Sequence, residues 1–501
     1  MSDSEPTRHS APPADARPPD APPGLGPIQA PPPPPGSSNK PLLALLIGGL
    51  LLAVAVTAGV VLLGGSPASS PSPTPTAVAP PPPSPTRGPV ASPTGPPSTP
   101  SPSPTMPTPS PAAPATPLDP GDVARLIDEV VAQVPPIREL EPLADVPYEL
   151  ISREDFEASL SELIYEETTP EELATQGRLL ERLGLLPAGA DLPGLIEELY
   201  GSQVAAYYRP DTGTFYVIER DEPFGAMDRM TVAHEYAHAL QDQHFGLEES
   251  RITDPAEGDA VLAQVAAIEG DAVLVMSLWA FEHLTPVEWM ALMGESMSPA
   301  DEELLESMPP ILRRQLEFPY VEGTVFVGEL FADGGWSAIN DALVTPPATT
   351  EQVLHPAKYF AGEEAVRVRV DDLSDVLGGW QRVHEETLGE LNVGVWLAGG
   401  EEPEQQLPGL PAVWPHADGA AGWGGDRLVM YEADAPDGWA IVWHIAWDSA
   451  GDADDFEARA GQLLRGLAGE ALVVRLDALN VALLVASDAD ALAALEDAIG
   501  D

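Results

Sequence analysis

The spacing of apolar positions divides residues 119 to 200 into helical segments. Apolar side chains recur every three or four residues in "DPGDVARLIDEVVAQV", "SREDFEASLSELIYEE" and "TPEELATQGRLLERLG", which is the period of a helix with one buried face. Ser152 and Thr169 stand at N-cap positions, and Gly184 ends the third segment. We therefore expect this stretch to be helical.

The pattern changes at residues 203 to 220, "QVAAYYRPDTGTFYVIER". Two runs of β-branched and aromatic residues flank the turn-forming sequence from Pro210 to Gly213, which predicts a β-hairpin. Its second strand, "TFYVIE", could offer an edge to which an extended peptide adds as a further strand.

Two helices are expected after the hairpin. The first runs from about Ala226 to Phe245, with Gly246 as its C-cap. The second begins in "DPAEGDAVLAQVAAIEGDAVLVMSLWAFEH", where Asp254 is the predicted N-cap and Glu257 its capping-box partner.

From about residue 366 the pattern contains short β-prone runs, "DRLVMYEA", "WAIVWHIAW", "ALVVRLD" and "NVALLVAS", and it closes with the helical "DADALAALEDAIG". We therefore predict an α+β fold, with a larger domain at residues 119–365 and a smaller α+β C-terminal lobe at residues 366–501.

The N-terminal 118 residues have a different composition. Residues 42 to 63 are uncharged and apolar, about the length that crosses the hydrocarbon core of a membrane, so we expect a transmembrane helix at residues 41–65. Of the 59 prolines, 35 lie before residue 119. Residues 1–40 and 66–118 are expected to be a disordered tail and a disordered stalk, because they contain too few apolar side chains to form a core.

Charge indicates an orientation and excludes some partners. Arg8, Arg17 and Lys40 precede the apolar run and the next cation is Arg87, so a single-pass protein of the cell membrane would have its N-terminus in the cytoplasm and its folded part outside. The net charge of −56 belongs to the folded part, which argues against nucleic acid as a partner. The absence of cysteine excludes thiolate metal ligands and a cysteine nucleophile.

The first of the two helices carries the motif HExxH. His234 and His238 are four residues apart and so lie on one face of the helix, where two imidazole nitrogens can bind one ion. Glu235 is rotated by about 100 degrees from His234, beside such an ion, where it could take a proton from a water molecule that Zn²⁺ activates. The motif therefore predicts a zinc site with Glu235 as general base.

A catalytic zinc site needs a third protein ligand. His244 would complete HExxHxxGxxH, but the position of the required Gly is occupied by Gln241, so the helix should continue and carry His244 to another face. Glu257 is an alternative. Glu269 falls in mid-helix on an apolar stripe, where a carboxylate is costly unless it is paired or bound to a metal, and this makes it the preferred third ligand. The stripe consists of Leu262, Val265, Val273 and Met276.

HExxH followed by a glutamate from a later helix resembles the gluzincin metallopeptidases. The sequences "HEYAHALQDQHF", "AAIEGDAVLVM", "FPYVEG", "PPATTEQVLHPAKY" and "GWGGDR" are similar to those of largely uncharacterised membrane-anchored or secreted metallopeptidases of bacteria and archaea. The resemblance covers roughly residues 120 to 460. It implies a zincin-like core, zinc at His234, His238 and Glu269, and Glu235 as base. The spacing from His238 to Glu269 is longer than in thermolysin-like enzymes, which keeps Glu257 as an alternative.

Three further residues have candidate roles. His355 could donate a hydrogen bond to the oxyanion of a tetrahedral intermediate, as a histidine does in thermolysin-like enzymes, and Tyr320 is an alternative donor. Asp271 could orient a ligating histidine, although a solvated charge is the simpler interpretation.

The sequence thus predicts a membrane-anchored, extracytoplasmic zinc metallopeptidase that acts on a peptide or protein substrate. The alternative is a stalked surface-binding domain in which the metal site is structural or degenerate.

Overall fold

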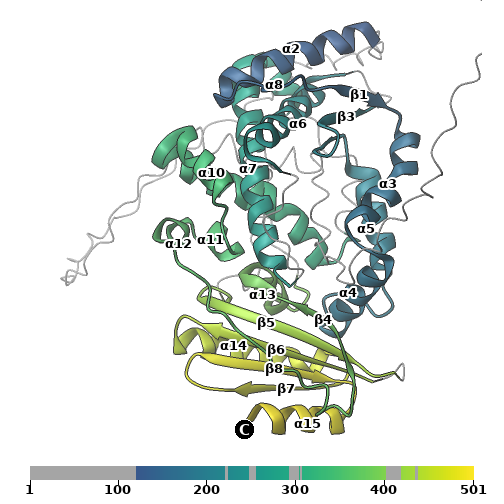
Figure 1. Cartoon of the computed structure of the whole chain (residues 1–501), viewed down its shortest axis with the longest axis vertical. Helices are drawn as coiled ribbons and strands as arrows, with labels where there is room; N and C mark the ends of the chain where they lie inside the picture. Colours follow the sequence, from purple (N-terminus) through teal and green to yellow (C-terminus); the bar gives the residue numbers. More distant parts are fainter. Residues whose placement is uncertain are drawn as a thin grey trace, which may run out of the picture. The chain divides into compact units, whose positions relative to one another are not determined.

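A computed structural model describes residues 120–219, 224–247, 256–292, 304, 307–401, 419–434 and 438–500. The protein has the expected mixed α+β fold (Figure 1). The expected transmembrane helix at 41–65, the proline-rich segments 1–40 and 66–118, and the expected N-cap Asp254 lie outside the described residues.

The helical segments expected near the N-terminus are present. Ser152 caps α3, its side chain accepting from the backbone N–H of Asp155, and Thr169 forms a capping box with Glu172 at α4. These contacts satisfy backbone N–H groups that a helix start leaves without partners. The helices are α2 (Pro120–Arg138), α3 (Arg153–Glu167), α4 (Pro170–Arg182) and α5 (Leu192–Gln203).

The predicted hairpin is confirmed, as β2 (Ala206–Arg209) and β3 (Thr214–Ile218). It belongs to a three-stranded sheet in the order β1-β3-β2, in which β1 (Tyr148–Ile151) pairs parallel to β3. The expectation that residues 119–200 are all helical was therefore wrong at β1. The strand "TFYVI" (β3) is the central strand of this sheet, so it offers no free edge to a peptide. Of the two hairpin strands, β2 is the one at an edge of the sheet.

Three long helices precede the C-terminal sheet: α6 (Ala226–Phe245), α7 (Gly258–His283) and α10 (Pro310–Val344). The bounds of α6 are those predicted, with Gly246 as C-cap at φ 73°. Helix α10 is interrupted at Gly335, which has φ 62°. Two short helices, α11 (Thr350–Leu354) and α12 (Pro356–Ala361), follow α10, and α8 (Pro286–Leu292) follows α7.

Helix α7 begins later than predicted. Glu257 occupies its N-cap position without a side-chain cap, so its expected role as a capping-box partner was wrong. Within the part of the chain that the structure describes, α7 is the one helix long and apolar enough to cross a membrane, and 83% of its most apolar window is buried in the protein. Packing against α6 and α10 accounts for its apolar composition.

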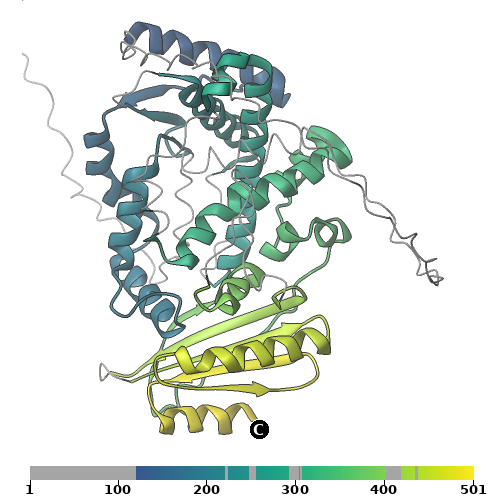
Figure 2. The same ribbon diagram turned by 180° about the vertical axis from the view of Figure 1, so that it is seen from behind.

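The C-terminal part contains a five-stranded antiparallel sheet in the order β4-β5-β6-β8-β7. Alternate residues of each strand face opposite sides of the sheet. Trp443 packs with Trp396 and Phe456 on one side, whereas Val442 packs with Leu495 on the other. Figure 2 shows one helix of this part, α14 (Ala450–Leu463), in front of the sheet. The elements are β4 (Gln381–Glu386), α13 (Gly389–Ala398), β5 (Trp423–Glu432), β6 (Trp439–Trp447), α14 (Ala450–Leu463), β7 (Glu470–Arg475), β8 (Asn480–Ala486) and α15 (Ala489–Gly500).

The first turn of α7 contacts the C-terminal part. Arg427 of β5 forms an ion pair with Glu257 at 2.8 Å, and the backbone N–H of Asp259 donates to the carbonyl of Thr387. Asp259 also accepts from the hydroxyl of Thr350 at 2.5 Å. These contacts fix one end of the helix that carries Glu269.

Candidate metal centre

His234 and His238 lie one turn apart on α6 and point to the same side. Their Nε2 atoms are 3.0 Å apart, and the side chains are 1% and 2% exposed. Because residues 230 to 241 of α6 are all buried between neighbouring elements, the two rings have little freedom to rotate away from each other.

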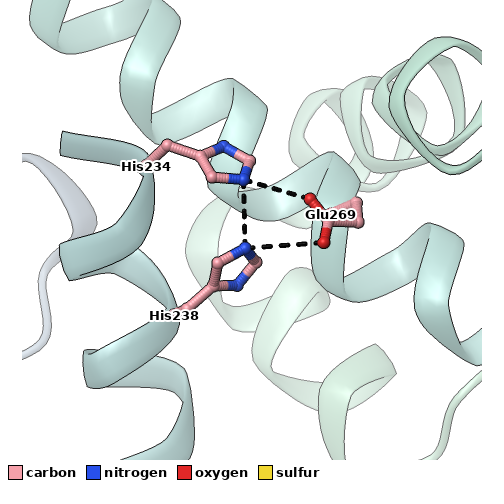
Figure 3. A group of neighbouring side chains, drawn as sticks. All are labelled: His234, His238 and Glu269. Carbon is pink, nitrogen blue, oxygen red and sulfur yellow. Dashed lines mark hydrogen bonds and ion pairs between the residues drawn. The ribbon is translucent and has the colours of Figure 1, made fainter. Parts of the chain in front are cut away.

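Glu269 of α7 completes a triangle with these two rings (Figure 3). One of its carboxylate oxygens lies 3.1 Å from Nε2 of His234 and the other 3.5 Å from Nε2 of His238. Ligands about 2.0–2.1 Å from a tetrahedral zinc ion are separated by about 3.3 Å. The three side chains therefore form a group that could hold a metal ion.

Mutual attraction sets the charges within the group. Burial lowers the pKa of His238, but the Glu269 carboxylate outweighs burial and raises that pKa to about 9. Burial raises the pKa of Glu269, but the two histidines outweigh it and lower that pKa to about 2. For His234, burial dominates and lowers the pKa. Glu269 and His234 thus already favour their ligand forms, whereas His238 must release a proton to bind a cation.

Glu235 lies next to this group without belonging to it. Its side chain is 0% exposed. Burial raises its pKa to about 8, and His238 and the nearby Tyr208 backbone of β2 oppose this only in part. Among the described residues, no hydrogen bond of normal geometry satisfies either of its carboxylate oxygens. A buried carboxyl of this kind can both accept and release a proton near neutral pH.

Tyr320 of α10 also reaches the group. Its ring centroid is 6.3 Å from that of His234. Burial, followed by the charges of Glu269 and Glu235, raises its pKa well above the usual value. The phenol therefore remains a hydrogen-bond donor at any physiological pH.

Two glycines bring Tyr320 and Glu269 together. A Cβ atom built on Gly270 would overlap the carbonyl of Gly323, and one built on Gly323 would overlap the carbonyl of Ala266. The backbones of α7 and α10 consequently touch at this crossing. The glycines of "EGDA" and "FPYVEG" are explained by this contact.

The other predicted candidates lie elsewhere. His244 is half-buried, and its Nε2 is 2.8 Å from the carbonyl of Glu141. Glu257 pairs with Arg427 and is not part of the metal-ligand group. Helix α6 continues through Gln241, which is the reason that His244 faces away, as expected.

His355 is bonded to Glu390 of α13, with 2.9 Å between Nε2 and Oε1. The next residue, Leu391, donates to Thr350, which in turn bonds Asp259. Asp259 precedes Glu269 by ten residues, about 15 Å along α7. The structure thus ties His355 to the N-terminal end of α7, and this placement does not support its predicted role as an oxyanion donor.

Sequence reasoning gave too little weight to Asp271 and none to Arg138. Asp271 is fully buried and paired with Arg138, so the interpretation as a solvated charge was wrong. It also accepts from the side chain of Gln241, which contacts His238. The signal in the sequence was Gln241, three residues after His238 on the same face of α6.

A second group of carboxylates already holds a cation. Glu351, Glu363 and Asp448 gather in metal-like geometry, but Nζ of Lys358 lies 2.6, 2.6 and 2.7 Å from them. Burial lowers the pKa of Lys358, and the three carboxylates outweigh burial and raise it. The ammonium group therefore occupies the place that a metal ion would take.

Comparison with known proteins gives one result. Residues 375–496 match a family described as a domain of unknown function (DUF8575), a range that runs from just before β4 to α15. No curated protein and no solved structure matches the chain. The residues similar to this family are those of the C-terminal sheet and its helices, and the metal-ligand group lies outside them.

Proposed function

We propose that the chain is a zinc metallopeptidase with a zincin-like core of the gluzincin type. The proposal rests on one observation. The Nε2 atoms of His234 and His238 and the carboxylate oxygens of Glu269 lie 3.0–3.5 Å from one another, and Glu235 is beside them on α6. A glutamate next to the ligands is what hydrolysis requires, because a purely structural metal needs no base.

His234, His238 and Glu269 would hold the ion. Zinc, when bound, would activate a water molecule and polarise a carbonyl group. Glu235 would take the proton from the attacking water and later transfer it to the nitrogen of the leaving amine. Its buried, weakly hydrated carboxyl is suited to this exchange because its pKa lies near neutrality.

Tyr320 is the better candidate for stabilising the oxyanion. Its phenol is held next to Glu269 and can donate a hydrogen bond to a negative oxygen that develops there. His355 is assigned no catalytic role in this proposal, because its partner Glu390 lies toward the other end of α7.

The substrate would be an extended peptide or protein segment. Strand β2 is an edge strand whose Tyr208 backbone lies against Glu235, so a peptide paired along it would pass the base. The net charge of −56 disfavours nucleic acid as a partner. We place the folded part outside the cell, anchored by the apolar residues 41–65 of the sequence.

A structural metal site is the second candidate, and one observation favours it. The three ligands and Glu235 are between 0% and 2% exposed, as in sites that are closed to substrate. A catalytic site would require the elements around Glu235 and β2 to open for a peptide.

The experiment uses the purified full chain in detergent, with zinc content and cleavage of an unfolded protein as readouts. The proposal predicts about one zinc per chain, and it predicts that Glu235→Gln keeps the metal but loses cleavage. Cleavage by Glu235→Gln at the wild-type rate would refute the assigned mechanism. Zinc binding without cleavage by the wild type would favour the structural site.

A further inference from the structure

A chain of buried polar side chains connects His238 to helix α2. Its members are Gln241 of α6, Asp271 of α7 and Arg138 at the end of α2, and each is 0% exposed. Burying such groups is costly unless each has a hydrogen-bond or ion-pair partner, and these three side chains provide partners for one another.

The side-chain amide of Gln241 has a defined orientation. Its Nε2 lies 3.0 Å from the carbonyl oxygen of Ile268 and 2.8 Å from Oδ2 of Asp271. A backbone carbonyl and a carboxylate paired with arginine are acceptors, so the amide nitrogen must face them. The amide oxygen must then face His238.

This orientation determines which nitrogen of His238 donates. Oε1 of Gln241 lies 2.9 Å from Nδ1 of His238 and can only accept, so Nδ1 carries a hydrogen. When His238 releases its other proton, the lone pair of Nε2 becomes available on the side of the ring that faces His234 and Glu269.

Arg138 anchors the far end of the chain. Its Nε lies 2.9 Å from a carboxylate oxygen of Asp271, its Nη2 is 2.7 Å from Oδ1 of Asn340, and its guanidinium group lies 4.6 Å from the ring centroid of Trp336. The charge of Asp271 is thereby neutralised within the core, and α2 is joined to the two helices that carry the ligands.

We propose that Gln241 is a positioning residue for the metal site, which it serves by holding His238 with Nδ1–H toward its amide and Nε2 toward the ion. Asp271 and Arg138 hold Gln241 in turn. This inference rests on the proposed function to the extent that the ion bound by His238 is zinc. Gln241 would accept the hydrogen bond from the ring N–H of the ligating histidine, which in most metal sites is accepted by a carboxylate or a backbone carbonyl.

The test is the zinc affinity of Gln241→Met, measured in the full chain by competition with a chromogenic chelator. Methionine has a similar size but cannot accept from Nδ1–H, so the affinity should fall about 10- to 100-fold. The matched control is Gln243→Met on the same helix. Gln243 accepts from the backbone N–H groups of Leu143 and Ala144, and its loss should leave the zinc affinity unchanged.

A second readout separates positioning from folding. In the zinc-loaded wild type, the Nδ1–H of His238 should give a nitrogen-attached proton resonance that exchanges slowly with water, and Gln241→Met should lose that protection. Should Gln241→Met fail to fold, the wild type alone still tests the inference, because nitrogen NMR of the His238 ring in the zinc-loaded protein shows whether Nδ1 or Nε2 carries the hydrogen.

The inference is overturned if Gln241→Met folds and binds zinc as tightly as the wild type, or if His238 in the zinc-loaded wild type carries its hydrogen on Nε2. Failure of the wild type to bind zinc would instead refute the proposed function. A wild type that binds zinc and a Gln241→Met variant that binds equally well refute the positioning role alone.

Discussion

The carbonyl of Gly323 occupies the position that a side chain at residue 270 would fill. Gly270 follows the ligand Glu269, and Gly323 lies three residues after Tyr320, so the closest approach of α7 and α10 is built into the metal centre. Glycine costs a helix about 1 kcal/mol relative to alanine. That cost is offset here by an approach of two backbones that no other residue permits.

Gly270→Ala should therefore destabilise the protein, by about 1–3 kcal/mol as in other overpacked cores, although alanine is the better helix former. Gly461 of α14 is the control, because a Cβ atom there meets nothing within 4 Å, and Gly461→Ala should be neutral or stabilising. Chemical denaturation of both variants measures the difference. An equally stable Gly270→Ala variant would contradict the close packing of α7 on α10.

Glu269→Ala should lower zinc affinity by more than about 100-fold. This loss exceeds the one expected when the substituted residue only forms a hydrogen bond with a ligand. Glu257→Ala is the matched control, since Glu257 lies at the N-cap of α7 but pairs with Arg427. Metal analysis after dialysis against a weak chelator distinguishes the two. Equal zinc retention by both variants would exclude Glu269 as a ligand.

Tyr320→Phe should reduce kcat by about 100- to 1000-fold with little change in zinc content, because it removes one donor to a developing oxyanion. Tyr359→Phe also loses a hydrogen bond, from its hydroxyl to the carbonyl of Thr345 at 2.9 Å, and should keep normal kcat. Steady-state kinetics on an unfolded protein substrate provide the measurement. A fully active Tyr320→Phe enzyme would remove the phenol from the mechanism.

Asp259 should make stability depend on pH. Burial, opposed by Thr350 and reinforced by Asp426, raises its pKa to about 8, so the folded state binds its proton more tightly than the unfolded state. This contribution is complete below pH about 4 and is lost as pH rises toward 8. Asp259→Asn should therefore gain stability relative to the wild type between pH 5 and pH 9, by at least about 2 °C in Tm.

Asp477 provides the opposite case for comparison. Hydrogen bonds from Asn480 and nearby backbone lower its pKa, so its contribution is lost only as pH falls below the usual carboxyl range. The difference in Tm between Asp477→Asn and the wild type should stay constant from pH 5 to pH 9. A constant difference for Asp259→Asn as well would show that Asp259 does not titrate in this range.

Local signals in the sequence predicted the parts of the fold that local chemistry determines. The bounds of α6 followed from its apolar spacing and Gly246, and the starts of α3 and α4 followed from Ser152 and Thr169. Strand β1 was not predicted, because its four residues become a strand only by pairing with β3, more than sixty positions later. Glu257 was misread because a capping box and an ion pair with a distant arginine leave the same local pattern.

The metal group was predictable for a related reason. HExxH places two side chains by helical geometry alone. A carboxylate on an apolar stripe must have a partner or a metal ion, and this reasoning identified Glu269 as the third ligand. The long-range contacts were not predictable in this way. These contacts depend on how α2, α10 and α13 cross α7. They are the proximity of Tyr320 to Glu269, the hydrogen bond of His355 with Glu390, and the ion pair by which Arg138 ends the polar chain from His238.

The ion pair of Glu257 with Arg427 and the hydrogen bond of Asp259 with Thr387 have a practical consequence for expressing the protein. A recombinant fragment cut in front of residue 375 would contain every ligand and the base, yet its ligand-bearing helix would lose partners at its first turn. The sheet of residues 381–486 would, in the same fragment, no longer shield that end from water. A fragment intended for biochemical work should therefore include the C-terminal sheet.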